Sequence, residues 1–155
     1  MGASLASAPL PQALEVTGNP IVTLQIAAEG RDANIFAYLE DVPPDGQVQV
    51  ITEGRLKASL RALNPPPFRV PGTPWHCSYA ADARALEPDQ PVTLHFDLMP
   101  TSYIVPRGHR IQLTITGADD RERNRDPKES GMRIDVSSTP ASPSYIELAM
   151  MARRR

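Results

Sequence analysis

Three histidines and one cysteine are the side chains best suited to nucleophilic or acid–base chemistry in this chain. His76 directly precedes Cys77, but adjacent side chains on an extended chain point apart, so we do not expect a nucleophile–base pair. His95 lies between apolar neighbours and should occupy the outer, solvated face of its strand. His109 is in phase with the apolar positions that follow it, which predicts a structural histidine bonded to a loop carbonyl. We therefore expect none of these four side chains to be catalytic.

The chain also lacks the patterns of a serine-hydrolase or metal centre. A nucleophile elbow needs Gly-x-Ser-x-Gly, and no two of the nine glycines are four positions apart. Scattered histidines and one cysteine do not match a zinc site. Acidic side chains gather in the loop 119–130 (Asp119, Asp120, Glu122 and Asp126). Arginines alternate with them and the glycine of a calcium loop is missing, so we expect a solvated, self-neutralising loop and neither metal nor cofactor.

Composition narrows the class of protein. A length of 155 residues suits one domain, 1–155, with its own apolar core and no stabilising metal or disulfide. The formal net charge of −2 argues against a nucleic-acid partner, although 151–155 form a basic tail. No apolar stretch approaches the roughly 18 residues of a membrane span, and the expected N-terminal arm, 1–12, lacks the pattern of a signal peptide. With a single cysteine and no membrane partner, the chain is predicted to be cytoplasmic.

Strand periodicity dominates the chain, and seventeen prolines argue against long helices. We expect about eight strands in an all-β, antiparallel β-sandwich of the jelly-roll type. The apolar run 34–42 predicts a strand covered on both faces, and Pro43-Pro44-Asp45-Gly46 predicts a hairpin connection after it. Glu53-Gly54 is interpreted as a bend or bulge before 55–62.

Alternation is clearest in residues 91–117, which predict two half-buried strands, 91–98 and 109–117, joined by a turn. Short strands are expected at 131–136 and 144–150. Tyr103 and Tyr145 fall at strand edges and are interpreted as core or rim residues.

Residues 64–90 form the exception, because they are rich in proline and show no period of either kind. Structureless segments of this length in a compact domain are usually functional or covered by a neighbour. The candidate interface or ligand residues of this loop are Phe68, Trp75, His76 and Tyr79. Interface cores are enriched in aromatic side chains, and prolines lower the entropy lost on docking, so we interpret the loop as an anchor for a partner domain. The alternative is an aromatic platform that binds a sugar.

Five motifs follow one another along the chain. They are Leu14-Glu15-Val16-Thr17-Gly18, then Phe36-Ala37-Tyr38-Leu39-Glu40-Asp41-Val42 with Pro44-Asp45-Gly46, then Thr52-Glu53-Gly54-Arg55-Leu56-Lys57-Ala58, then Phe96-Asp97-Leu98-Met99-Pro100-Thr101-Ser102-Tyr103, and last Gly108-His109-Arg110-Ile111. In these motifs, from about residue 10 to about residue 150, the chain resembles the C-terminal, non-catalytic domain of X-Pro dipeptidyl-peptidases, cocaine esterases and α-amino-acid ester hydrolases. One departure is Asn19, which stands where the family pattern has histidine.

The resemblance implies a galactose-binding-like jelly roll that accompanies an α/β-hydrolase domain with a Ser-His-Asp triad, in the same polypeptide or encoded separately. It implies structural roles for the motif residues Asp45, Gly46, Pro100, Thr101, Ser102, Gly108, His109 and Arg110. We therefore expect an accessory domain of a serine hydrolase that cleaves amides or esters, and a chain that is catalytically silent when isolated. Two alternatives are a free-standing module for carbohydrate or another small ligand, and a scaffold that associates into a homo-oligomer.

Overall fold

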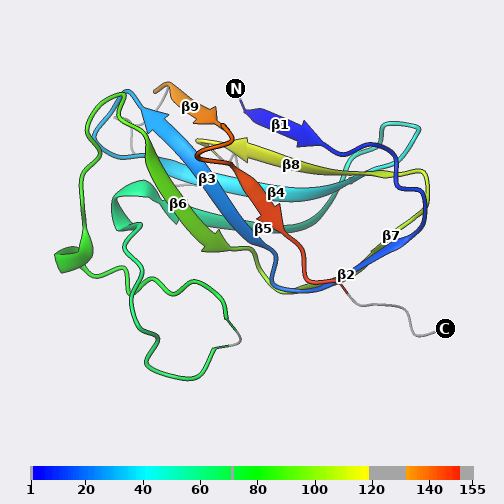
Figure 1. The fold of residues 1–155 in the computed structure, drawn as a ribbon, viewed down its shortest axis with the longest axis horizontal. Coiled ribbons are helices and arrows are strands. Elements are labelled where there is room, and N and C mark those ends of the chain that lie inside the picture. Colours follow the sequence, from blue (N-terminus) through cyan, green and yellow to red (C-terminus); the bar gives the residue numbers. More distant parts are fainter. Residues whose placement is uncertain (1, 71, 119–131, 151–155) are drawn as a thin grey trace.

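The computed structural model describes residues 2–70, 72–118 and 132–150, and this part of the chain is built almost entirely from strands (Figure 1). The ten strands are β1 (Ala3–Ala6), β2 (Leu14–Gly18), β3 (Ile21–Ala28), β4 (Asn34–Val42), β5 (Gln49–Lys57), β6 (Val92–Asp97), β7 (Thr101–Val105), β8 (Arg110–Thr116), β9 (Ile134–Ser137) and β10 (Tyr145–Glu147). Two 3-10 helices, η1 (Ala58–Leu60) and η2 (Ala80–Asp82), are the only helical turns in the described residues. The all-β class is confirmed.

Two antiparallel sheets and a two-stranded ribbon make up the fold (Figure 1). One sheet has the order β1-β8-β4-β5, the other has the order β10-β3-β6, and β2 pairs with β7 in the ribbon. Strand β9 pairs with the same edge of β3 as β10 does, because β6 occupies the opposite edge. Strands β3 and β4 lie in different sheets, as do β5 and β6, so the chain crosses repeatedly between the layers. Such crossing is the pattern of a jelly-roll sandwich.

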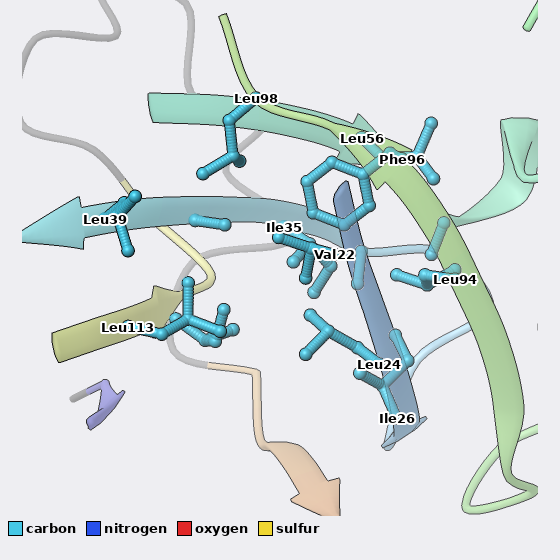
Figure 2. Close-up of a cluster of buried hydrophobic side chains, with 14 of the residues drawn as sticks. Val22, Leu24, Ile26, Ile35, Leu39, Leu56, Leu94, Phe96, Leu98 and Leu113 are labelled. Carbon is cyan, nitrogen blue, oxygen red and sulfur yellow. The ribbon is translucent and has the colours of Figure 1, made fainter. Parts of the chain in front are cut away.

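The apolar core lies between the two sheets (Figure 2). Side chains of β3 and β6 pack there against those of β4, β5 and β8, because each sheet must bury its apolar face. The labelled members of this cluster are Val22, Leu24, Ile26, Ile35, Leu39, Leu56, Leu94, Phe96, Leu98 and Leu113, none of which is more than 8% exposed.

The predicted strand 34–42 and the connection after it are confirmed. Strand β4 is an inner strand, paired with β5 on one side and β8 on the other, which accounts for its long apolar run. In the turn that follows, the backbone N–H of Gly46 donates to the carbonyl of Pro43 at 2.9 Å. Gly46 has a φ of 81°, which glycine adopts without steric cost.

The predicted bend at Glu53-Gly54 is wrong. Strand β5 continues through both residues, and the register of the β4–β5 pair shifts instead at Leu39/Glu40. Gly54 allows a close approach of backbone: a Cβ added there would lie 2.7 Å from the carbonyl oxygen of Asp97. The strand then ends at Lys57, where η1 begins, so 55–62 is not a strand throughout.

The two alternating runs in 91–117 are strands, but they are not joined by a turn as predicted. Strand β7 lies between them, and β6 and β8 belong to opposite sheets. The crossing occurs at Leu98 and Met99, whose N–H groups donate to Pro20 and Glu53 respectively. Alternation identifies a half-buried strand but does not say which sheet covers it.

The ends of the chain also differ from expectation. The N-terminal arm contains a strand, β1, whose four residues are all exposed and which pairs with the edge of β8. Neither face of β1 is buried, and even Leu5 is 59% exposed, so no hydrophobic alternation marks this strand. Strands β9 and β10 confirm the two predicted near the C-terminus, at shorter lengths.

Candidate functional site

Loop 64–90 reaches away from the sandwich on the side of β6, and η2 is the one helical turn in its described residues (Figure 1). At its base, the N–H of Asn64 donates to the carbonyl of Trp75 at 2.9 Å. The side-chain oxygen of Asn64 accepts the N–H of Cys77 at 3.0 Å. A projecting lobe, residues 65–74, is thereby closed at its neck, which is the arrangement of a compact surface loop.

The second half of the loop returns along the sandwich. The N–H groups of Arg84, Leu86 and Asp89 donate to the carbonyls of residues 59, 31 and 28, at 2.7–2.8 Å. The Leu86 side chain is 1% exposed and joins the core cluster. In the first half of the loop, residues 64–79, the described backbone N–H groups make no such bonds to the sandwich, and we call this segment the free half.

This free half presents large apolar side chains to solvent. Phe68 is 57% exposed, Tyr79 is 67% exposed, and Leu63 at the loop entrance is 56% exposed. The Phe68 and Trp75 rings meet edge to face, with centroids 4.9 Å apart and planes at 77°. The indole N–H of Trp75 is buried and has no hydrogen-bond partner, unlike every other buried side-chain polar atom of the described residues. Of the predicted interface residues, the structure brings Phe68 and Trp75 into contact.

His76 joins three segments through its ring. Its Nδ1 lies 3.0 Å from the carbonyl oxygen of Ala62, and its Nε2 lies 3.0 Å from the carbonyl oxygen of His95 in β6. Backbone carbonyls thus engage the ring on both sides.

His95 lies on the outer face of β6, between buried Leu94 and Phe96, as predicted, but it is half-buried rather than fully solvated. Its Nδ1 lies 2.9 Å from the hydroxyl of Thr23 on the neighbouring strand. Thr23 and His95 are directly paired in the β3–β6 ladder, so the contact is a cross-strand hydrogen bond.

A buried carboxylate, Asp41, holds the second polar cluster. Asp41 is 3% exposed; its Oδ1 lies 2.8 Å from Nδ1 of His109, and its Oδ2 accepts the Tyr103 hydroxyl at 2.9 Å. Burial, and then the hydrogen bond to Asp41 and its negative charge, raise the pKa of Tyr103. The predicted partner of His109, a loop carbonyl, is wrong, because its Nδ1 contacts the Asp41 carboxylate instead. The sequence did carry one signal for this cluster: Asp41 is in phase with Ile35 and Leu39, the core-facing positions of β4. A carboxylate at such a position needs hydrogen-bond partners.

The remaining motif residues also have structural contacts. Asp45 accepts the N–H of Gln47 at 3.1 Å, and Pro100 precedes β7, which begins with Thr101 and Ser102. The Ser102 hydroxyl lies 3.3 Å from that of Thr17. Gly108, with a φ of 85°, donates to Leu10, and Arg110 donates to the carbonyl of Ser7. Asn19, the departure from the family pattern, donates to Asp97 and to the carbonyl of Leu98.

No catalytic or metal arrangement is visible in the described part of the chain. None of the three histidines there is hydrogen-bonded to a serine. The same residues contain no group of three or more histidine, cysteine or acidic side chains placed to bind a metal. Nor do they include a helix with the length and apolarity needed to cross a membrane. The acidic loop 119–130 and the basic tail 151–155 lie outside the described residues.

The sequence matches a known family over almost its whole length. The family model that covers residues 3–147 is that of the X-Pro dipeptidyl-peptidase C-terminal non-catalytic domain. A protein of Mycobacterium tuberculosis named "Putative serine esterase" is 49% identical over 115 residues, which are 73% of this chain and 18% of that protein. An Xaa-Pro dipeptidyl-peptidase of Lacticaseibacillus casei is 32% identical over 66 residues, 43% of this chain and 8% of the enzyme. The chain thus spans about a fifth or less of these relatives.

Solved structures show the same fold at lower identity. An α-amino acid ester hydrolase superposes with a TM-score of 0.77 at 20% identity, covering 97% of this chain and 25% of that one. A CocE/NonD family hydrolase of Staphylococcus aureus superposes with a TM-score of 0.78 at 16% identity, covering 97% and 30%. Together with the β-sandwich and the match over residues 3–147, these similarities show that the chain belongs to the X-Pro dipeptidyl-peptidase C-terminal, non-catalytic domain family.

Proposed function

We propose that this chain is an accessory domain that docks onto the α/β-hydrolase catalytic domain of a serine hydrolase through loop 64–90. The family is non-catalytic by description, and the mycobacterial relatives named as serine esterases are more than five times the length of the matched segment. The reaction of such an enzyme, the hydrolysis of an ester or amide, would belong to that other part. The role of this chain is then to stabilise the catalytic domain and cover one flank of it.

The exposed aromatic side chains of the loop are the main support. Phe68 and Tyr79 are each more than half exposed, although burial of such side chains is worth about 1.5–3 kcal/mol. The indole N–H of Trp75 lacks an acceptor, and a buried donor without one costs about 1–3 kcal/mol. A partner surface with apolar side chains would bury Phe68 and Tyr79. One carbonyl or carboxylate oxygen on that surface, reached by a small shift of the lobe, would accept the indole N–H of Trp75.

The ring geometry disfavours the carbohydrate alternative. Sugars stack on flat, exposed aromatic faces, whereas Phe68 and Trp75 meet at 77° and share no plane. Trp75 is also half-buried, at the neck of the lobe.

An exchange protein tests the docking. The exchange protein is the M. tuberculosis relative in which the matching C-terminal-domain segment has been replaced by this chain. Two quantities are measured on it: the midpoint temperature of thermal unfolding and the rate of hydrolysis of an aryl ester. We expect the exchange protein to keep ester turnover and to unfold at a higher temperature than the relative with the segment deleted. Phe68→Ser with Tyr79→Ser should lower the midpoint of the exchange protein but leave that of the isolated chain unchanged, because these side chains are exposed in it.

The matched control is Val48→Ser. Val48 is 51% exposed and lies in the β4–β5 connection, at the other end of the sandwich from the loop (Figure 1). It should leave both proteins unchanged. Docking through the loop is contradicted if the Val48 variant and the loop variant lower the midpoint of the exchange protein equally.

A further inference from the structure

The His76 ring lies between two hydrogen-bond acceptors. The carbonyl oxygens of Ala62 and His95 are each 3.0 Å from one of its nitrogens. A carbonyl oxygen can only accept, and a neutral imidazole has one N–H and one bare nitrogen. Both contacts can therefore be hydrogen bonds only when the ring is protonated on both nitrogens.

We propose that protonation of His76 fastens loop 64–90 to β6, so that the docking surface of the loop is set by pH. We call the two ring contacts the His76 latch. The consequence for docking rests on the function proposed above, whereas the latch itself is a property of this chain alone.

The position of the latch explains how one proton could control the lobe. Ala62 lies at the entrance of the loop, and His76 follows Trp75, whose carbonyl closes the neck of the lobe. Strand β6 is the edge strand of its sheet, with β3 on its other side, so its outward carbonyl is open to the loop. The ring therefore ties the two ends of the lobe to the sandwich at one point.

Four other charged or titratable side chains on these segments have hydrogen-bond partners other than His76. Their hydrogen-bond partners are the carbonyls of residues 58 and 84 for Arg61, Asn64 for Asp82, Thr23 for the His95 ring, and Asn19 for Asp97. Cys77 adjoins His76 and contributes its backbone N–H to Asn64. No carboxylate is a hydrogen-bond partner of the His76 ring in the described residues, so two carbonyl dipoles stabilise the added charge.

The direction of the effect follows from the donor count. When the ring carries both protons, it donates to both carbonyls and the lobe is fastened. When it has lost one proton, one nitrogen presents a lone pair to a carbonyl oxygen, and that contact becomes repulsive. The lobe should then open more often.

Two measurements on the isolated chain test the latch. Long-range proton–nitrogen spectra of the three imidazoles should show both nitrogens of His76 protonated at pH 5.5. Amide exchange, corrected for intrinsic rates, should show the protection of Asn64 and Cys77 falling about two- to tenfold between pH 5.5 and pH 8, the loss of one hydrogen bond. A single protonated nitrogen at pH 5.5, or protection that does not change with pH, would overturn the latch.

Two variants sharpen the result. His76→Gln cannot change its charge, so loop protection should become independent of pH. His95→Gln leaves the backbone carbonyl used by His76 in place, so the pH dependence should persist. If the dependence survives in His76→Gln, another group is responsible and the latch is wrong.

A third measurement separates the latch from the docking. Calorimetric binding of this chain to the truncated M. tuberculosis relative, compared at pH 6 and pH 8, should be tighter at pH 6. A latch seen by exchange without any binding would refute the docking alone. Binding that is equal at both pH values, with a latch seen by exchange, would refute the pH control of docking.

Discussion

In the sandwich, strands β3 and β4 have a paired neighbour on each side and bury their apolar faces, whereas the lobe of loop 64–90 is held by separated polar contacts at Asn64 and His76. The core side chains are at most 8% exposed, but Phe68 and Tyr79 in the loop are more than half exposed. The same types of side chain thus stabilise the fold in one region and remain available to a partner in the other. Stability and recognition are located in separate parts of one domain.

The largest difference should appear between two phenylalanines. Phe96→Ala removes a side chain that is 1% exposed, and we expect it to lower the free energy of unfolding by about 3–5 kcal/mol. Phe68→Ala, at a site 57% exposed, should change it by about 0.5 kcal/mol or less. Urea unfolding measures both changes in free energy, provided that the slope of the free energy against urea concentration is the same in both variants. Equal losses would show that the loop belongs to the core.

Gly54→Ala examines the sandwich at its closest backbone approach. The added Cβ would lie 2.7 Å from the carbonyl oxygen of Asp97 and 2.8 Å from Cδ2 of Leu98, so we expect a loss of about 1–3 kcal/mol in the unfolding free energy. Because the nearest atom is backbone, adding Leu98→Val should not restore stability. If Leu98→Val did restore stability, the steric clash of the added Cβ would be with the Leu98 side chain and not with the backbone.

Tyr103 gives the sandwich a dependence on alkaline pH. Its pKa is raised in the folded chain, so the unfolded chain loses this proton first, and the stability from this group is lost as the pH rises through about 10 and beyond. Tyr103→Phe should cost about 0.5–1.5 kcal/mol at neutral pH and should reduce the decline of stability between pH 9 and pH 11. An unchanged decline in the variant would assign it to other groups.

Asn64→Ala should have the smallest global effect. It removes the acceptor for the N–H of Cys77, and we expect that amide to exchange faster. The free energy of global unfolding should change by only about 0.5 kcal/mol, because the lobe is not part of the core. A global loss as large as that of Gly54→Ala would mean that lobe and sandwich unfold as one unit.

Much of the fold could be predicted because its signals are local. Strand β4 was bounded by its apolar run, and the turn at Gly46 by proline and glycine. Loop 64–90 was recognised by the absence of any period. The cytoplasmic location and the lack of nucleic-acid or membrane partners stay predictions from the sequence, and the homo-oligomer stays one of the alternatives.

The polar clusters could not be predicted, because their members are far apart in the chain. Asp41 lies 62 residues from Tyr103 and 68 from His109, and no pattern of period two connects them. The two carbonyls that hold the His76 ring carry no sequence signal at all, since every residue has one.

By itself, the sequence determined most of the strands, the turn 43–46, the aromatic loop and the family, because alternation, proline and glycine act over a few neighbouring residues. Only the tertiary structure decided that β6 and β8 lie in opposite sheets and that the backbone at Asp97 packs closely against Gly54. It also decided that the His76 ring lies between two carbonyl oxygens. These depend on how the two sheets pack, and packing is set by contacts between distant segments.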